Sequence, residues 1–321
     1  MIISASRRTD IAAYYSEWFI NRIKDGYCTV PNPFNTKQIS FVDLKATSVD
    51  VIVFWTRNAA PLLQHLDYLD DEGYRYYFQY TINNLPRKYE KNNPSLSHSI
   101  KVFKDISERL GQGKVIWRYD PILITEDLNF SFHKENFKNI FSEIGGYTKR
   151  IVISIADIYK KTQMRLDAIN TKYNINQLDE DRIEDLLYYF ANLAMENGLD
   201  IESCAESIDL EHLGIKHGKC VDDELIKNEF GIYKNYKKDK SQRLVCGCTE
   251  SKDIGMNNTC LMGCEYCYAT FSNERAIENK KNHDPEFPSL IKHELTQETR
   301  EKIKSFKENL FRESPQISLK L

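Results

Sequence analysis

The sequence lacks the features that define several classes of protein. No run approaches the ~18 consecutive apolar residues that a membrane-spanning helix needs, so we expect no membrane segment. No GxGxxG, GxxxxGKS/T or GxSxG motif occurs. Dinucleotide-dependent hydride transfer, nucleotide hydrolysis and serine esterase chemistry therefore have no motif to support them.

An excess of charge of one sign is also missing. The 44 lysines and arginines nearly balance 47 acidic residues, which gives a formal net charge of −3. The basic run at 233–243 contains tyrosines, but neighbouring acids at 222–224 and 239 offset it. A solvated loop is therefore our interpretation, and binding of nucleic acid is not indicated.

The N-terminus, MIISASRRTD, has apolar residues before its arginines, the reverse of the order in a signal peptide. We therefore expect a cytoplasmic protein. In that reducing compartment, the eight cysteines favour metal or redox chemistry over a framework of disulfides.

Short apolar runs rich in β-forming residues alternate with amphipathic helical patterns along the first two thirds of the chain. This alternation predicts a parallel sheet with helices outside it. Either an open doubly wound sheet or a barrel fits the pattern, and we expect an α/β fold of the partial TIM-like (β/α)6 barrel type. The six expected strands lie at 2–6, 49–55, 74–82, 114–123, 150–158 and 199–205, and helices are expected at 11–25, 98–110, 133–144, 180–196 and 296–311.

Polar side chains gather where the expected strands end. Any one of them can simply terminate a strand, but several arginines and acids at one rim favour a binding or catalytic site, because parallel α/β folds place their sites there. The candidate catalytic residues, as contacts to substrate or cofactor, are Arg8, Asp10, Arg57, Arg118, Asp120 and Glu206.

The β–α alternation ends near residue 206. We therefore divide the chain into a (β/α) barrel domain at 1–206 and a cysteine-rich segment at 207–321. No linker rich in proline, glycine or serine separates the two. We expect the second segment to pack on the barrel and cover its mouth without folding independently.

The stretch TCLMGCEYCYA at 259–269 has the cysteine spacing C-x3-C-x2-C, with Cys260, Cys264 and Cys267 as candidate metal ligands. Three thiolates on a [4Fe–4S] cluster leave one iron without a protein ligand, free to bind a cofactor or substrate. A structural zinc site needs four ligands and favours closer cysteine pairs, so it fits this spacing poorly.

Four further cysteines form a second candidate set of metal ligands: Cys204, Cys220, Cys246 and Cys248. They could hold a second iron–sulfur cluster or zinc. Alternatively, Cys204 is a small buried hydrophobic residue and Cys220 is incidental. In another alternative, Cys246 or Cys248 supplies a fourth ligand to the first cluster and closes it.

The C-x3-C-x2-C stretch resembles the cluster loop of the radical S-adenosylmethionine (radical SAM) enzymes. Its three cysteines match the three ligands of that loop, and Tyr266 stands where the superfamily places an aromatic residue that contacts adenine. The resemblance implies a [4Fe–4S] cluster that binds S-adenosylmethionine and cleaves it reductively to a radical, which abstracts hydrogen from a substrate.

Over nearly its whole length, the chain resembles the bacterial domain-of-unknown-function 1848 family. This resemblance implies a cysteine cluster near the C-terminus, similar to the one near the N-terminus of radical SAM proteins, and brings no established reaction with it. It is carried by SASRRTDIAAYYSEWF (4–19), VFWTRN (53–58), WRYDPIL (117–123), SCAES (203–207), HGKC (217–220), DKSQRLVCGC (239–248) and CLMGCEYCYA (260–269).

Together these features predict a radical-SAM-like iron–sulfur enzyme that acts on an unknown substrate. Such an enzyme needs an electron donor such as a ferredoxin or flavodoxin. The alternative is a non-catalytic iron–sulfur or zinc protein, whose cysteines are structural or transfer electrons. The alternative predicts a closed site with four ligands, whereas the enzyme predicts three protein ligands and an exposed iron.

Overall fold

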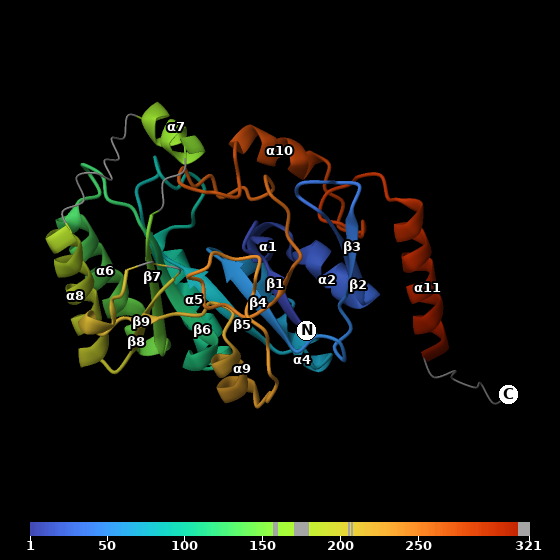
Figure 1. The fold of residues 1–321 in the computed structure, drawn as a ribbon, viewed down its shortest axis with the longest axis horizontal. Helices are drawn as coiled ribbons and strands as arrows, with labels where there is room; N and C mark the ends of the chain where they lie inside the picture. Colours follow the sequence, from blue (N-terminus) through green and yellow to red (C-terminus); the bar gives the residue numbers. More distant parts are fainter. Residues whose placement is uncertain (157–159, 170–179, 205, 207, 314–321) are drawn as a thin grey trace.

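An eight-stranded parallel sheet forms the centre of the molecule (Figure 1). The computed structural model describes residues 1–156, 160–169, 180–204, 206 and 208–313. The strand order is β10-β1-β4-β5-β6-β7-β8-β9, and every neighbouring pair is parallel. The strands are β1 (Ile2–Ala5), β4 (Val51–Thr56), β5 (Tyr76–Thr81), β6 (Val115–Ile122), β7 (Arg150–Ile155), β8 (Asp200–Ser203), β9 (Lys216–His217) and β10 (Lys252–Asp253).

The six strands expected from the sequence are all present, and they lie side by side in chain order. This order differs from that of a doubly wound sheet, in which the order reverses at a switch point. Among the described residues no pairing joins the edge strands β9 and β10, so the structure is an open α/β sheet and shows no closed barrel. Positions 157, 158 and 205, at the ends of two expected strands, lie outside the described residues.

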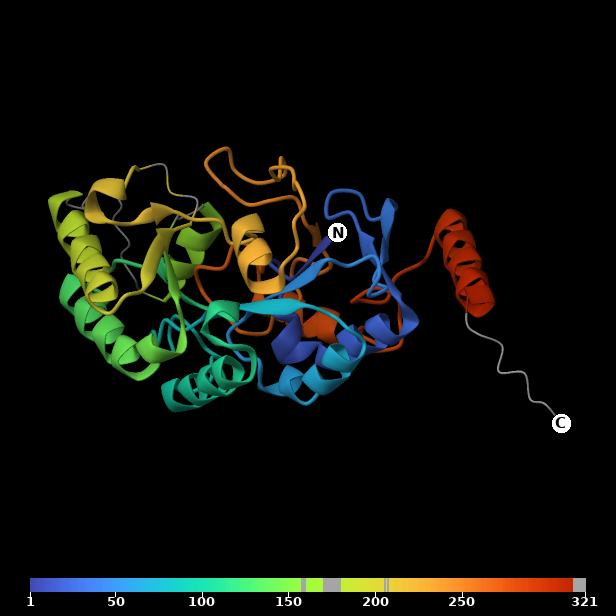
Figure 2. The same cartoon turned by 90° about the horizontal axis from the view of Figure 1, so that it is seen from below.

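Alternate residues of the strands bury two different faces, as the two-residue period of a strand requires. Ile3 and Ile52 join the main core beneath the helices, on what we term the helix face. Ile2 and Val51 join a smaller core on the opposite, inner face, where Leu225 of α9 (Asp223–Phe230) packs against them. Figure 2 shows α9 on one side of the sheet and the longer helices on the other.

Helices of the helix face largely match the expected periodic segments. Ser95 caps α5 and Asn129 caps α6, each accepting a hydrogen bond from a backbone N–H in the first turn. The expected helix 11–25 is broken at Tyr15, whose φ of −139° is not helical, and it ends at Gly26 with φ 75°. The helices on this side are α1 (Ile11–Tyr14), α2 (Ser16–Asp25), α3 (Ala60–Leu63), α4 (Leu66–Asp71), α5 (Leu96–Leu110), α6 (Phe130–Ile144) and α8 (Glu180–Glu196).

Several elements were not expected from the sequence: the edge strands β9 and β10, the helix α7 (Lys160–Ala168), and an antiparallel hairpin of β2 (Tyr27–Pro31) and β3 (Ile39–Asp43). The hairpin has an aromatic surface. Its Tyr27 and Phe41 rings stack at 5.3 Å, and Phe306 of α11 (Gln297–Glu313) packs against both. The hairpin therefore gives the C-terminal helix an apolar surface to pack on.

The chain beyond residue 206 contributes a strand to each edge of the sheet. β9 pairs with β8 at one edge, and β10 pairs with β1 at the other. The remaining helices are α7 (Lys160–Ala168), which precedes this segment, and α10 (Asn273–Lys281) within it. None of the described helices is both long and apolar enough to cross a membrane.

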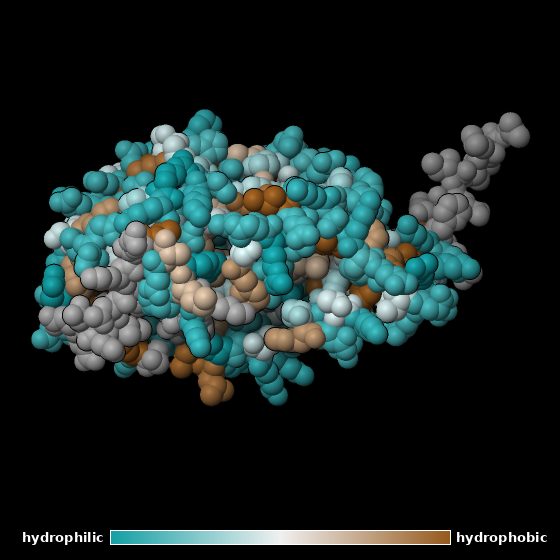
Figure 3. All heavy atoms as spheres, turned by 90° about the horizontal axis from the view of Figure 1, so that it is seen from above, coloured by the Kyte–Doolittle hydropathy of each residue, from teal (hydrophilic) through white to brown (hydrophobic). Residues whose placement is uncertain are grey.

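The face seen in Figure 3 is mostly hydrophilic among its coloured residues, and its hydrophobic side chains occur in small, separate groups. A broad docking surface would need a larger continuous apolar area. The feature of interest is instead a cavity at the carboxyl ends of the strands.

Candidate functional site

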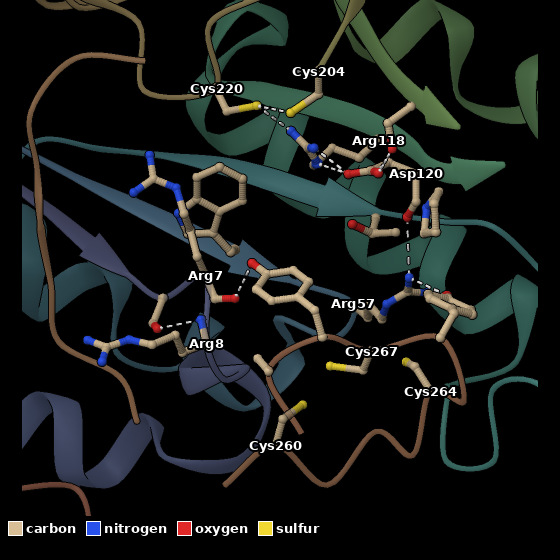
Figure 4. Close-up of a pocket in the computed structure, with 18 of the residues that line it drawn as sticks. Arg7, Arg8, Arg57, Arg118, Asp120, Cys204, Cys220, Cys260, Cys264 and Cys267 are labelled. Atoms are coloured by element: carbon tan, nitrogen blue, oxygen red, sulfur yellow. Dashed lines mark hydrogen bonds and ion pairs between the residues drawn. The ribbon is translucent and has the colours of Figure 1, made fainter. Parts of the chain in front are cut away.

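A cavity of about 420 Å³ lies at the carboxyl ends of the parallel strands. Its walls contain side chains that follow β1, β4 and β8, together with two loops of the C-terminal segment (Figure 4). Every candidate residue from the sequence lines this cavity: Arg8, Asp10, Arg57, Arg118, Asp120, Glu206, Tyr266, Cys204, Cys220, Cys246, Cys248, Cys260, Cys264 and Cys267. Their proximity is therefore established, and their roles remain predictions.

The loop after β1 is fixed by Asp253 of β10. This carboxylate pairs with Arg8 at 3.0 Å and accepts hydrogen bonds from the Arg7 backbone N–H and the Ser6 hydroxyl. Burial alone would raise the pKa of Asp253, but the charge of Arg8 and these hydrogen bonds outweigh it, so the pKa is lowered. Arg8 is thus already neutralised by a partner within the chain.

Asp10 joins the first two strand ends. One of its oxygens accepts from the Ala13 backbone N–H and caps α1, while the other accepts from the Arg57 backbone N–H at 2.7 Å. Burial raises the pKa of Asp10 to about 6, against the opposing effect of these hydrogen bonds. Asp10 is therefore the N-cap of α1 as well as part of the cavity wall.

The Arg57 guanidinium lies between Glu90 and Tyr266. Its Nη1 is 2.7 Å from Glu90 Oε1, and its Nη2 donates to the Tyr266 hydroxyl at 2.7 Å. Tyr266 in turn donates to Glu90. Burial would lower the pKa of Arg57, but the charge of Glu90 outweighs it and the pKa is raised, so the guanidinium stays charged beside the Cys264 loop.

Arg118 and Asp120 form a second buried charge pair in the cavity wall. Arg118 donates through Nε and Nη2 to one oxygen of Asp120, and its Nη1 donates to Gln79 and to the Cys220 sulfur at 2.9 Å. Burial would raise the pKa of Asp120, but the charge of Arg118 and a hydrogen bond from Ser154 lower it. The pair is therefore ionised and linked to a cysteine.

The loop 259–269 is anchored just before Cys260 and again between Cys260 and Cys264. Tyr15 donates to the Thr259 carbonyl at 2.7 Å, and the Asn92 backbone N–H donates to the Met262 carbonyl at 3.0 Å. Cys260, Cys264 and Cys267 are all free and half-buried. Burial, followed by the charge of Asp10, raises the pKa of Cys260 to about 12.

The second set of cysteines meets on another part of the cavity wall. The Cys204 and Cys220 sulfurs are 3.2 Å apart. Hydrogen bonding with Cys220, then with Cys246, and the charge of Arg7 lower the pKa of Cys248. Conversely, donating to Cys204 and then to Cys248 raises the pKa of Cys220. The pKa values of Cys220 and Cys248 are therefore shifted in opposite directions.

Within the described ranges, no group of three or more His, Cys, Asp or Glu side chains could already hold a metal ion as it stands. The two cysteine sets nevertheless supply thiol donors of the kind that zinc and iron–sulfur sites use.

Sequence reasoning missed three residues of the site. Trp55 lies between two guanidiniums, with its ring centre 5.1 Å from Arg7 and 5.2 Å from Arg118. Glu90 is the buried partner of Arg57, and Asp253 is that of Arg8. Trp55 is the last residue of the expected strand at 49–55, so its place at a strand end could have marked it as a site residue. Glu90 lies in a loop without any distinctive pattern.

The fold and the site define an α/β protein with an open parallel sheet and a cysteine-lined cavity at its strand ends. The chain belongs to the family described as "Domain of unknown function (DUF1848)", whose model matches residues 2–269. No curated protein matches it. A crystal structure of a candidate α-L-fucosidase from Bacteroides thetaiotaomicron VPI-5482 aligns at 9% identity and a TM-score of 0.25, over 74% of this chain and 85% of the other.

Proposed function

We propose that this protein is a radical-SAM-like iron–sulfur enzyme. Cys260, Cys264 and Cys267 would bind a [4Fe–4S] cluster that keeps one iron open, and S-adenosylmethionine would bind at that iron. The observation that supports this proposal is the shared cavity. Three thiols from one short loop line the same space as the charged side chains at the strand ends.

The finer description of the fold belongs to the same proposal. In it, the sheet is a partial (β/α)6 barrel, and the loop 259–269 covers its mouth. The anchoring of this loop on Tyr15 and Asn92 supports that view, because these contacts come from different connections of the sheet. A cluster-binding loop late in the chain could then occupy the place that the first loop takes in other radical SAM enzymes.

When bound, the cluster and S-adenosylmethionine would supply reductive cleavage of the sulfonium and abstraction of a hydrogen atom from the substrate. The residues of this chain would shield the cluster and S-adenosylmethionine from water and orient them. Arg57 holds its charge beside Cys264, because Glu90 keeps it ionised. Tyr266 is the candidate contact to the adenine, and its hydroxyl is held by Arg57.

The partners follow from this chemistry. The cluster would take its electron from a donor such as a ferredoxin or flavodoxin in the cytoplasm. The substrate would enter between the charged strand ends, where Arg57, Arg118 and Asp120 line the cavity.

The test is anaerobic reconstitution with iron and sulfide, followed by addition of S-adenosylmethionine and dithionite. We expect 5′-deoxyadenosine by mass spectrometry, and a change in the EPR signal of the reduced cluster when the cofactor is added. Cys264→Ala should abolish both. Cys28→Ala is the matched control, because Cys28 is a buried cysteine of the β2–β3 hairpin that does not line the cavity.

If the wild-type protein with a fully reconstituted cluster forms no 5′-deoxyadenosine, the proposed enzymatic function is refuted. A cluster with four cysteine ligands and no response to S-adenosylmethionine would support the alternative, a structural or electron-transferring protein. Zinc at Cys260, Cys264 and Cys267 would exclude the proposal directly.

A further inference from the structure

We infer that Cys204, Cys220, Cys246 and Cys248 form a second metal site, which binds a thiophilic metal through four thiolates. This site goes beyond the proposed function and does not depend on it. It lies on a different part of the same cavity wall, as the positions of Cys204 and Cys220 relative to the three other labelled cysteines show in Figure 4.

The four thiols line the same cavity. The Cys204 and Cys220 sulfurs are 3.2 Å apart, and the Val221 backbone N–H, next to Cys220, donates to the Cys248 sulfur at 3.4 Å. Cys246 lies two positions before Cys248. Cys204 and Cys220 are 16 positions apart, and Cys220 precedes the Cys246–Cys248 pair by 26, so the tertiary fold brings these segments together.

Four sulfur donors match the coordination of a closed zinc or iron–sulfur site. A redox-active dithiol would need only the two closest cysteines and would leave Cys246 and Cys248 without a role. Three of the four thiols are buried, and they pack against apolar side chains of the inner-face core. The same thiols also line the cavity, whose wall contains arginines.

Two arginines of the cavity wall suit a metal–thiolate centre. Four thiolates around a divalent cation leave a net negative charge, which nearby guanidiniums stabilise. Arg118 donates to the Cys220 sulfur at 2.9 Å. Arg7 lines the same cavity as Cys248, and its Nη2 is buried without a hydrogen-bond partner among the described residues. A fully charged sulfur at position 248 would give this nitrogen an acceptor.

The location also explains what such a metal would do. Cys204 directly follows β8, Cys220 follows the neighbouring edge strand β9, and Cys248 lies a few residues before β10 at the opposite edge of the sheet. The loop around Cys248 is already tied to the inner face, because the Thr249 backbone N–H donates to the Val221 carbonyl at 3.0 Å. A metal at the four thiols would cross-link segments from both edges over the inner face.

The experiment removes the first cysteine set and examines what metal remains. The full-length triple variant Cys260→Ala/Cys264→Ala/Cys267→Ala is purified anaerobically, stripped with a chelator, and reloaded with Zn²⁺ alone or with Fe²⁺ and sulfide. We expect about one equivalent of zinc, or about four of iron with as much sulfide. Adding Cys220→Ala and Cys248→Ala to the triple variant should reduce binding at least about tenfold. Adding Cys28→Ala instead should leave it unchanged.

The two reloading conditions distinguish zinc from an iron–sulfur cluster, either of which four thiolates could bind. Preferential retention of zinc identifies a structural ion, and retention of iron with sulfide identifies a cluster. No bound metal in a folded triple variant would overturn the inference, as would a Cys204–Cys220 disulfide found by peptide mass spectrometry in protein isolated without metal. If the triple variant does not fold, Co²⁺ titration of the wild-type apoprotein replaces it. In that titration, the Cys220→Ala/Cys248→Ala variant should give a weaker sulfur-to-cobalt absorption band than the wild-type protein. An equal band would overturn the inference.

This readout is independent of the enzymatic proposal. The triple variant lacks the thiols that the proposed reaction needs, and metal content is measured without S-adenosylmethionine. If the wild-type protein makes no 5′-deoxyadenosine but the triple variant binds metal, only the proposed enzymatic function is refuted. The converse result would refute only the second site.

Discussion

Replacing Arg118 with methionine keeps much of the apolar stem of the side chain but removes a buried positive charge. Arg118 is 4% exposed and donates hydrogen bonds to Gln79, Asp120 and Cys220. Its loss would leave the Asp120 carboxylate without its directly bonded countercharge. Breaking a buried ion pair in this way costs about 3–5 kcal/mol. Because the Asp120 side chain is 21% exposed to the cavity, we expect the lower end, about 3 kcal/mol.

The assay is urea unfolding of the reduced, metal-free protein at pH 7, which gives the free energy of unfolding of each variant. Asp120→Asn is measured as well, together with the double variant Arg118→Met/Asp120→Asn. The double variant should be more stable than the sum of the two single losses predicts, by at least about 1 kcal/mol, because neither charge is then left unpaired.

The matched control is Arg109→Met. Arg109 pairs at 2.6 Å with both Asp67 and Asp70, but it lies at the surface, where such pairs contribute at most about 1 kcal/mol. If Arg118→Met destabilises the protein no more than Arg109→Met does, or if the two single losses add without coupling, the cavity wall is not held by this charge pair.

Three further predictions concern other parts of the fold. Burial lowers the pKa of His133 from 6.5 to about 4. The stability that its neutral form contributes is therefore fully present above pH 6.5, and about 3 kcal/mol of it is lost as the pH falls to 4. In urea unfolding measured as a function of pH, His133→Gln should remove this acid sensitivity. Gly255→Ala should cost about 1–3 kcal/mol, because a Cβ there would lie 2.1 Å from Ser6 Oγ. Tyr266→Phe should also cost about 1–3 kcal/mol, because it removes an acceptor of Arg57 and a donor to Glu90.

Each of these predictions has its own control. For His133, an unchanged dependence of stability on pH between 6.5 and 4 in His133→Gln would show that another group is responsible. Gly146→Ala is the control for Gly255, since an added Cβ would meet no atom within 4 Å. Exposed Tyr233 is the control for Tyr266, and Tyr233→Phe should be neutral. Equal effects within either pair would contradict the packing and hydrogen-bond arguments.

Most of the sheet could be predicted from the sequence because strand formation leaves a local pattern. The runs at 49–55 and 74–82 are rich in β-branched and aromatic residues, and both became strands in the expected place. The hairpin β2–β3 was missed because proline, which is rare within strands, interrupts the β-forming pattern at Pro31. The break at Tyr15 was missed because amphipathic periodicity continues through it.

The sequence alone determined which residues could form the site. Strand-end position selected the charged candidates, and cysteine spacing selected Cys260, Cys264 and Cys267, because both signals are local. The tertiary structure decided what these residues meet. Glu90 neutralises Arg57 across 33 positions, and Cys204 meets Cys220 across 16. Such contacts depend on which strands are neighbours and on which side of the sheet the chain returns. Long-range geometry of this kind leaves no periodic pattern in the sequence.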